Sequence, residues 1–480
     1  MDLTRRDFAI GAAAIGLAAS VGSGVARAAK PKALDAIVLG AGVSGLNAAW
    51  LLEQEGMKVL VLEGRQRVGG RVLTLMDQPG YPEMGFNSMG EGYGRGIDAA
   101  MRAGVELENI SPRFGGSSQE LYLGGKRISK EEWARSPLNP FPDALKTAMP
   151  WEVVNRLVHQ HNRLPDFNTW NDPANAALDI SLHSFLKAQG LNDAAIRLAH
   201  DVSPYYGTSA YDVSALMLEF NDGFIAGQIA AGPRSLAVKG GNIKLPIGMA
   251  KLLKGDLLFG KEVVAIDSQT GMAEVRCADG SVYTAPRVIC SLPFSTLRHI
   301  AITPGLSGSQ ALAVTTLRYN PITIAFLTFT EPFWESDGFA PGMFTDDHLG
   351  VVMPQRFGSD PANPTAITGL TVQARGQLAY YWDAMGKDAA LQYVVQRLEA
   401  LRPAAKGKVK GAAIHSWASE RFNMGDWCYF APGQIAAFAA GMAAPAGRIH
   451  FCGEHTAVGA RGLEGAFESS ERVALEVMTA

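Results

Sequence analysis

A glycine-rich turn between an apolar strand and a helix constrains the fold of this chain more than any other feature. Residues 35–40 form a short apolar run that is typical of a buried parallel strand. The turn Gly40-Ala41-Gly42-Val43-Ser44-Gly45 follows, and residues 43–55 then carry apolar side chains at helical spacing. A second apolar run covers residues 58–63. This strand, helix and strand predict the opening of an α/β sheet.

The same turn predicts a dinucleotide site. Gly40 permits the tight turn, Gly42 lets the backbone approach a pyrophosphate, and Gly45 lets helix and strand pack closely, with the helix N-terminus facing the anion. Glu63 ends the second strand, 18 residues after Gly45, where it is positioned to accept hydrogen bonds from ribose hydroxyls. A glycine turn that binds nothing is the alternative, and the strand, helix and terminal acid together disfavour it.

Composition excludes several classes of protein. The 480 residues carry 43 Lys and Arg against 46 Asp and Glu, a net charge of -3, which provides no large basic field for nucleic acid or anionic membranes. Apolar residues make up 47% of the chain, enough for a large core. At about 150 residues per domain, the length suggests two or three folding units. The four cysteines (Cys277, Cys290, Cys428 and Cys452) show neither zinc-ligand nor disulfide-framework spacing, so we expect no metal.

The first residues resemble a targeting signal. Arg5-Arg6 precedes a weakly apolar Ala/Gly run, and Ala26-Arg27-Ala28 is a small-residue cleavage pattern. We therefore predict a twin-arginine signal peptide over residues 1–28 and a periplasmic protein that is exported folded. A transmembrane helix after the arginine pair is the alternative, but this stretch is too weakly apolar to anchor stably. The later sequence contains no run of 18 apolar residues, so we predict no stable membrane anchor.

The rest of the chain alternates between helical and strand patterns. Residues 85–234 are expected to be mostly helical. Strands are predicted at 262–267, 273–277 and 287–292, with a hairpin turn at Asp279-Gly280, and the later predictions are strands at 322–328, 366–372 and 448–452 and helices at 388–401 and 463–478.

A second glycine- and arginine-rich segment, residues 65–74, follows the second strand, and nicotinamide dehydrogenases do not need such a segment. With it, the sequence resembles the flavin-containing amine oxidase family of monoamine oxidases, polyamine oxidases and L-amino-acid oxidases. The further motifs that carry the resemblance run through nearly all of the mature chain in the family's order: Lys239 to Pro246, Ser291 to Pro293, Glu331 to Trp334, Phe451 to Thr456 and Gly462 to Ala466.

The resemblance implies an α/β fold in which a GR2-type, Rossmann-like FAD-binding domain is interleaved with an α+β substrate-binding domain. The expected FAD-binding segments are 35–86, 235–297 and 412–478, and the expected substrate-binding segments are 87–234 and 298–411. By the same resemblance, the FAD pyrophosphate would contact Gly40, Gly42, Gly45, Arg65, Gly70 and Arg71. The adenosine would contact Glu63 and Val263. The flavin and the ribitol phosphate would contact Gly85, Phe86, Asn87, Gly453, Glu454, Leu463 and Ala466.

In this family an amine enters between aromatic rings that stand near the flavin. The resemblance makes Trp427 one wall, with ordinary core packing as the alternative role. The second wall would stand at Gly462, so we expect a half-open cage with room for a bulky amine. Asp426 occupies the place of the cysteine that binds flavin covalently in some members, which predicts non-covalent FAD.

Two further departures concern the substrate and the electron acceptor. Ser88 occupies the place of the arginine that holds the substrate carboxylate in L-amino-acid oxidases, and Arg95 is out of step, so an amine without an α-carboxylate is favoured. The lysine that promotes reaction with oxygen in family oxidases is replaced by Ile324, beside Thr323. We therefore expect oxygen to react slowly and a periplasmic electron carrier to serve as an alternative acceptor.

Together these features predict that FAD takes a hydride from the α-carbon of a small-molecule amine at flavin N5. The imine formed would hydrolyse to an aldehyde or ketone, and O2 or a periplasmic carrier would reoxidise the flavin. The alternatives are an L-amino-acid oxidase, a flavin desaturase or isomerase on the same fold, and a flavin-bound protein without catalytic activity. A homodimer is an open alternative, and no nucleic-acid partner is expected.

Overall fold

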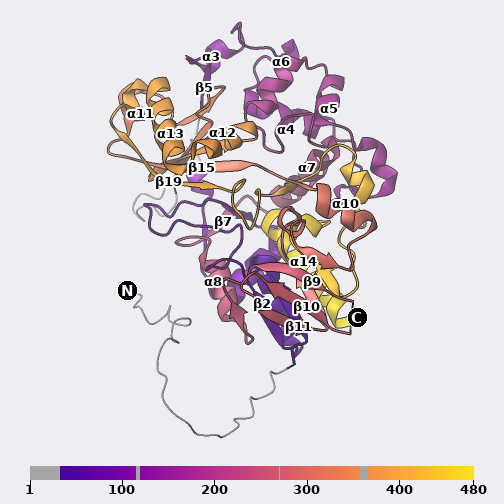
Figure 1. Cartoon of the computed structure of the whole chain (residues 1–480). Coiled ribbons are helices and arrows are strands. Elements are labelled where there is room, and N and C mark those ends of the chain that lie inside the picture. The colour runs from indigo at the N-terminus through magenta and orange to yellow at the C-terminus, as the bar shows by residue number, and fades with distance from the viewer. Residues whose placement is uncertain (1–32, 115–118, 270, 357–365, 480) are drawn as a thin grey trace, which may run out of the picture. The chain divides into compact units, whose positions relative to one another are not determined.

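The computed structural model describes residues 33–114, 119–269, 271–356 and 366–479 (Figure 1). Residues Leu34–Ala480 form one compact unit. The predicted signal peptide over 1–28 lies outside the described residues and stays a prediction.

A parallel sheet of five strands forms around the two apolar runs nearest the N-terminus. Its order is β21-β12-β1-β2-β8, and every neighbouring pair is parallel. All residues of β1 and β2 are buried, as the continuous apolar runs predicted. The strands are β1 (Ala36–Leu39), β2 (Val59–Leu62), β8 (Leu257–Leu258), β12 (Arg287–Cys290) and β21 (Ile449–Phe451).

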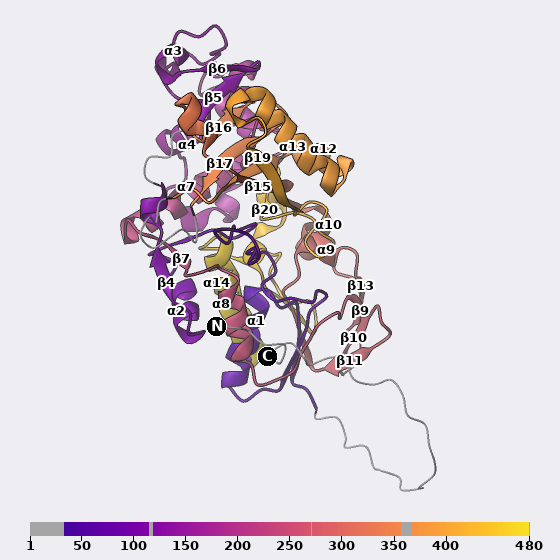
Figure 2. The ribbon, with the colours of Figure 1, turned by 90° about the vertical axis from the view of Figure 1, so that its left-hand side faces the viewer.

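Helices pack against this sheet through one continuous apolar cluster. Leu46 and Leu52 of α1 (Val43–Gln54) and Phe467 of α14 (Gly462–Thr479) belong to it and are fully buried. The Asn47 side-chain amide donates to Ser470 Oγ at 2.8 Å between the same two helices. Figure 2 shows α1, α8 (Lys244–Lys251) and α14 close together in this part of the chain. The predicted α/β fold is confirmed.

A second sheet of seven strands forms a separate layer, with the order β19-β15-β18-β17-β16-β5-β6. Only β16 and β5 are parallel neighbours within it. The strands are β5 (Gln119–Leu123), β6 (Lys126–Ile128), β15 (Ile322–Phe329), β16 (Gly342–Thr345), β17 (Val351–Gln355), β18 (Gly369–Arg375) and β19 (Val409–Ser416).

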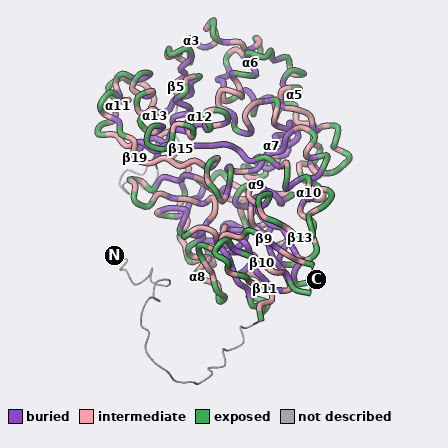
Figure 3. Tube along the Cα trace, in the orientation of Figure 1, coloured by how far each residue is buried: buried purple, intermediate pink, exposed green. Residues whose placement is uncertain are grey.

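Two groups of helices bury the central strands of this sheet. Trp382 of α12 (Gln377–Met385) and Val394 of α13 (Lys387–Leu401) share an apolar cluster with Val372 of β18. Trp151 of α4 (Pro150–Gln160) contacts the Phe344 ring of β16. Figure 3 shows β15 buried along most of its length.

The remaining elements are shorter. Small sheets contain β3 (Met89–Gly90), β7 (Ser235–Val238) and β4 (Leu107–Asn109); β11 (Val282–Ala285), β10 (Ala273–Cys277), β9 (Val263–Asp267) and β13 (Ala301–Thr303); and β14 (Arg318–Tyr319) with β20 (Cys428–Tyr429). The other α-helices are α2 (Gly94–Arg102), α3 (Lys130–Trp133), α5 (Leu182–Ala188), α6 (Asp193–Ile196), α7 (Ala215–Ala231), α9 (Phe294–Leu297), α10 (Gly308–Thr316) and α11 (Phe333–Asp337).

The structure corrects two expectations from the sequence. The Asp279-Gly280 turn joins β10 to the short strand β11, whereas β12 leaves this hairpin and enters the parallel sheet beside β1. Residues 85–234, expected to be mostly helical, contain helices α2 to α7 and also short strands, of which β5 and β6 extend the seven-stranded sheet. β5 and β6 form a local hairpin, but the pairing of β5 with β16 and that of β12 with β1 join residues far apart in the sequence, so local patterning could not reveal those two.

The predicted division into FAD-binding and substrate-binding domains stays a prediction. The strands of the parallel sheet come from all three segments that were assigned to FAD binding. No helix among the described residues is long and apolar enough to span a membrane.

Candidate active site

A cavity of about 620 Å³ opens where the parallel strands end. Gly40 follows β1, Glu63 follows β2, Ser291 follows β12 and Gly453 follows β21, and all four line it. The carboxyl edge of an open parallel sheet is where α/β proteins bind ligands. The fold therefore concentrates the predicted site residues at one place.

Most of the residues predicted for FAD and substrate line this cavity. Those that do are Gly40, Gly42, Glu63, Arg65, Gly70, Arg71, Gly85, Phe86, Asn87, Val263, Trp427, Gly453, Glu454, Gly462, Leu463 and Ala466. Gly45, Thr323 and Ile324 are not among the lining residues. Their roles stay predictions, and the structure shows which of them share one space.

The three glycines of the turn differ in what a side chain would meet. A Cβ on Gly45 would lie 2.1 Å from the Gly40 carbonyl oxygen, so Gly45 serves the packing of α1 on β1. A Cβ on Gly42 would meet nothing nearer than the Gly70 Cα, at 4.0 Å. Gly42 and Gly70 thus present bare backbone to the cavity, which is what close approach of a pyrophosphate requires.

Glu63 lies at the end of β2 and is held by the backbone. Its two carboxylate oxygens accept hydrogen bonds of 2.8 Å from the amides of Ala41 and Arg65. The Arg65 guanidinium, in turn, donates to the Asn423 side chain and lies 3.4 Å from Glu420. A fixed carboxylate in the cavity wall suits ribose hydroxyls, because it can accept further hydrogen bonds.

Arg71 and Glu454 form an ion pair in the cavity wall. Arg71 Nη1 lies 3.0 Å from Glu454 Oε1 and donates to the Asp426 carbonyl oxygen at 2.6 Å. The Cys428 amide donates to the same Glu454 oxygen at 2.9 Å. Burial alone would raise the pKa of Glu454, but the Arg71 and Arg461 guanidinium groups hold it below its usual value. Glu454 is therefore a carboxylate that balances the charge of Arg71.

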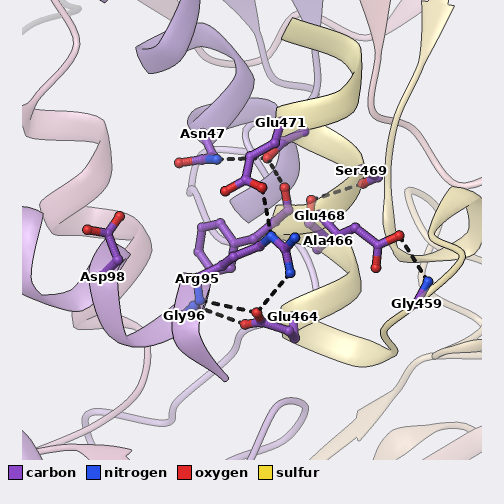
Figure 4. Close-up of polar contacts among 12 residues, drawn as sticks. Asn47, Arg95, Gly96, Asp98, Gly459, Glu464, Ala466, Glu468, Ser469 and Glu471 are labelled. Atoms are coloured by element: carbon purple, nitrogen blue, oxygen red, sulfur yellow. Dashed lines mark hydrogen bonds and ion pairs between the residues drawn. The ribbon is translucent and has the colours of Figure 1, made fainter. Parts of the chain in front are cut away.

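The N-terminus of α14 contributes Leu463 and Ala466 to the cavity. Glu464 anchors it, because its carboxylate accepts from the backbone amides of Arg95 and Gly96, each at 3.1 Å (Figure 4). The Arg95 guanidinium also pairs with Glu464 and Glu471. Arg95 thus faces α14 and does not line the cavity. A helix N-terminus fixed at the cavity stabilises negative charge there.

The aromatic wall has one member that the sequence did not reveal. Tyr205 lines the cavity with Trp427, and their ring centroids are 5.3 Å apart at an angle of 32°. At Gly462 a Cβ would meet nothing within 4 Å, so this position leaves open space. Tyr205 lies between η5 (Arg197–Asp201) and α7, in a segment whose spacing carries no cofactor or substrate motif.

The two residues predicted near the oxygen-reactive position lie inside β15. Thr323 and Ile324 are 1% and 6% exposed, and Thr323 Oγ1 donates to Asp383 at 2.8 Å. Two lysines that could have replaced the missing cation, Lys239 and Lys244, do not line the cavity. Among the described residues, Lys261 is the one lysine that does, and it lies 2.6 Å from Asp279.

Three features fit a dinucleotide: the bare backbone of Gly42 and Gly70 (the glycine floor), the fixed Glu63 carboxylate and the N-terminus of α14. The cavity continues from Glu63 past the Gly42 and Gly70 backbone to Trp427 and Tyr205, so it joins the predicted adenosine and substrate ends. The residues present therefore suit FAD, with its flavin toward the aromatic wall.

The glycine geometry yields a prediction about cofactor loading. Gly42→Val should retain its fold but lose most bound FAD, because a Cβ at this position would lie no nearer than 4.0 Å to a protein atom and the side chain would enter the cavity. The fold is checked by circular dichroism, and FAD is measured by absorbance after acid precipitation of the protein. Gly227→Ala, where a Cβ also meets nothing within 4 Å, is the control and should load FAD normally. Normal FAD content in Gly42→Val would contradict the placement of the pyrophosphate.

Comparison with known sequences supports the same assignment. The profile of the family described as flavin containing amine oxidoreductase matches residues 43–478. The chain is 26% identical over 461 residues to an L-amino-acid oxidase from Echis ocellatus, covering 91% of this chain and 86% of that protein. It is also 26% identical over 481 residues to the putative L-amino-acid oxidase YobN of Bacillus subtilis, covering 95% and 96%.

Solved structures show the same fold. Cyclohexylamine oxidase from Brevibacterium oxydans superposes with a TM-score of 0.73 at 20% identity, covering 93% of this chain and 99% of that one. Putrescine oxidase bound to putrescine gives a TM-score of 0.71 at 22% identity with the same coverage. The resemblance seen in the sequence is confirmed, as is FAD as the cofactor. The chain belongs to the flavin-containing amine oxidoreductase family and is an FAD-dependent enzyme that oxidises amines or amino acids.

Proposed function

We propose that this enzyme oxidises the carbon–nitrogen bond of an amine without an α-carboxylate, using FAD that is not covalently attached. The observation that carries the proposal is the lining of the cavity. Ser88 stands there in place of the arginine that holds the substrate carboxylate in L-amino-acid oxidases, and Gly462 leaves open space. Bound FAD supplies the oxidation, by accepting a hydride from the α-carbon at N5. The imine product then hydrolyses to an aldehyde or ketone.

The protein's contribution under this proposal is orientation and exclusion of water. Trp427 is partly buried, packs against two apolar clusters and contacts the Tyr205 ring at an angle of 32°, and these contacts restrict the motion of its ring. A fixed ring can hold the reacting carbon at the geometry that transfer requires, and misplacement by about 1 Å can cost about 100-fold in rate.

An L-amino-acid substrate is the second candidate, and one observation favours it. The Arg375 guanidinium lies 5.5 Å from the centroid of Tyr205 and forms no ion pair among the described residues. Its side-chain hydrogen bonds go to Gln373 Oε1, at 3.1 and 2.6 Å. A guanidinium without an acidic partner is suited to a carboxylate, but Arg375 is not among the residues that line the cavity, so a substrate would reach it only past Tyr205, which is. Several relatives at about 25% identity carry the name L-amino-acid oxidase.

The proposal also covers the cellular location of the enzyme and the electron acceptor that reoxidises its flavin. The twin-arginine pattern supports export to the periplasm with FAD already bound. The apolar Ile324 position and the absence of a cavity lysine other than Lys261 among the described residues support a slow reaction with oxygen and a periplasmic electron carrier as a better acceptor.

A substrate panel tests the proposed function. Purified enzyme is mixed anaerobically with primary and secondary amines, diamines and L-amino acids, and bleaching of the flavin absorbance is recorded. We expect amines without an α-carboxylate to bleach it fastest. Faster reduction by L-amino acids would replace the first candidate with the second. Bleaching by neither class would favour a desaturase, an isomerase or a flavin-bound protein without catalytic activity.

Trp427→Ala should slow anaerobic flavin reduction by the best amine about 100-fold, because the rigid wall that orients the substrate is lost. FAD content should fall far less. The control is Tyr381→Ala, which removes an exposed ring that does not line the cavity and should keep the wild-type rate. Equal losses of rate and FAD in Trp427→Ala would assign this residue to core packing.

Reoxidation tests the acceptor. We expect amine-reduced enzyme to reoxidise in air-saturated buffer more slowly than turnover requires, since no lysine stands at the Ile324 position to stabilise developing superoxide. Added cytochrome c or a redox dye should accelerate the reaction in stopped-flow measurements. Reoxidation by air that keeps pace with turnover, without acceleration by either carrier, would identify an ordinary peroxide-producing oxidase.

A further inference from the structure

Asn320 joins the two segments of the chain that carry the aromatic wall of the cavity. It follows β14 directly and is 0% exposed. Its backbone amide donates to the Trp427 carbonyl at 2.9 Å, and its own carbonyl accepts from the Asp426 amide at 2.9 Å. These two bonds continue the pairing of β14 with β20. The backbone of Asn320 therefore holds the segment on which the Trp427 ring stands.

The side chain of Asn320 reaches the other segment, which carries Tyr205. Its Oδ1 accepts from the Gly207 amide at 2.7 Å, and its Nδ2 donates to the Tyr205 carbonyl at 3.0 Å. These partners fix the orientation of the side chain, because an N–H needs an acceptor opposite it and a carbonyl needs a donor. A side-chain amide, which has one group of each kind, satisfies both partners at once.

The segment that carries Tyr205 has few other restraints on its backbone. It lies between η5 and α7, where residues 203–213 form neither helix nor strand. The backbone groups of Tyr205, Tyr206 and Gly207 form no other hydrogen bond with a described residue. The position of this backbone therefore depends on the Asn320 side chain and on the packing of neighbouring rings.

The Tyr205 ring is the part of this segment that faces the cavity. The Tyr206 ring flanks it, with centroids 4.9 Å apart at an angle of 84°. Although 52% of Tyr205 is exposed, burial raises the pKa of its phenol, because the exposed side faces a cavity inside the protein. Asn320 thus spans the backbone of the two residues, Tyr205 and Trp427, whose rings form the aromatic wall.

We infer that Asn320 is the positioning residue of the aromatic wall: its side-chain amide holds the Tyr205 ring beside Trp427 and so shapes the space for the carbon skeleton of the substrate. This inference rests on the proposed function, in which that wall orients the amine. Asn320 does not line the cavity, so it acts only through Tyr205. Because Gly462 provides no ring, the placing of Tyr205 determines how a bulky amine is held.

A double-mutant cycle tests whether Asn320 acts through Tyr205. Asn320→Ala removes both side-chain hydrogen bonds but keeps the backbone bonds to the Trp427 segment. Anaerobic flavin reduction by the best amine should slow about 10-fold, because a loosely held ring misplaces the substrate. In a Tyr205→Ala background the same substitution should change the rate by less than about twofold, because the ring that it positions is gone. Equal fold-losses in the two backgrounds would overturn the inference.

The size of the substrate gives a second readout that a general loss of stability would not change. Amines that reduce the wild-type flavin and differ in the bulk of their carbon skeleton are compared. The loss of rate in Asn320→Ala should grow with bulk, because a larger skeleton reaches the Tyr205 ring. FAD content should stay at the wild-type level. A loss that is the same for every amine would overturn the inference.

Asn139 provides a matched control elsewhere in the chain. It is 5% exposed, and its side-chain amide also bridges backbone groups, because it donates to the Trp133 and Lys146 carbonyls and accepts from the Phe141 amide. None of these residues lines the cavity. Asn139→Ala should lower the thermal stability, as Asn320→Ala does, but keep the wild-type rates for all amines. The same size-dependent loss in Asn139→Ala would overturn the inference.

A milder variant covers the case in which Asn320→Ala does not fold. Asn320→Asp keeps the shape of the side chain and the acceptor for the Gly207 amide, but it sets an oxygen against the Tyr205 carbonyl. We expect a loss of rate that grows with amine bulk and shrinks in the Tyr205→Ala background. Wild-type rates in Asn320→Asp for every amine would overturn the inference.

The proposed function and the role of Asn320 fail in different ways. If no amine bleaches the wild-type flavin, the proposed function is wrong. If amines bleach it but the loss in Asn320→Ala depends neither on Tyr205 nor on the bulk of the amine, the function stands and the role of Asn320 is wrong.

Discussion

The ion pair between Arg71 and Glu454 joins parts of the chain on which the whole cavity depends. The two residues are 383 positions apart, and their charged atoms lie 3.0 Å from each other. Arg71 also binds the Asp426 carbonyl, and the Cys428 amide binds Glu454, so three distant segments meet at one pair. Because either charge alone would be costly to bury, this wall forms only when all three segments are in place.

This arrangement also determines which groups remain available to ligands. The Arg71 guanidinium is balanced by Glu454, Glu63 is held by two backbone amides, and Glu464 caps α2. The glycine floor contributes no side chain. The cavity therefore offers mostly fixed dipoles and backbone along the cofactor end, and the uncommitted carboxylate of Asp426 stands beside the aromatic wall.

The sequence predicted the parts of this site that local rules determine. The G-x-G-x-x-G turn and Glu63 follow from spacing, and the place of the last helix beside the cofactor was implied by the family resemblance. All of them contribute to the cavity lining, apart from Gly45, which packs α1 against β1. Tyr205 and Arg375 could not be predicted, because the approach of Tyr205 to Trp427 and of Arg375 to Tyr205 depends on how distant segments fold together. Thr323 and Ile324 were placed by counting along a family motif, which fixes a position on a strand but not the direction of its side chains.

The choice between amine and amino acid depends on Tyr205 more than on Ser88. The Arg375 guanidinium is attracted to the face of the Tyr205 ring, at a distance where a cation–π interaction is favourable. Tyr205 is itself 52% exposed and contacts Trp427, so a modest rotation of its ring would change what Arg375 faces. Tyr205 and Trp427 line the cavity, whereas Arg375, which contacts the Tyr205 ring, is not among the lining residues. An aromatic wall whose neighbouring guanidinium stays out of the cavity lining supports a substrate without a carboxylate.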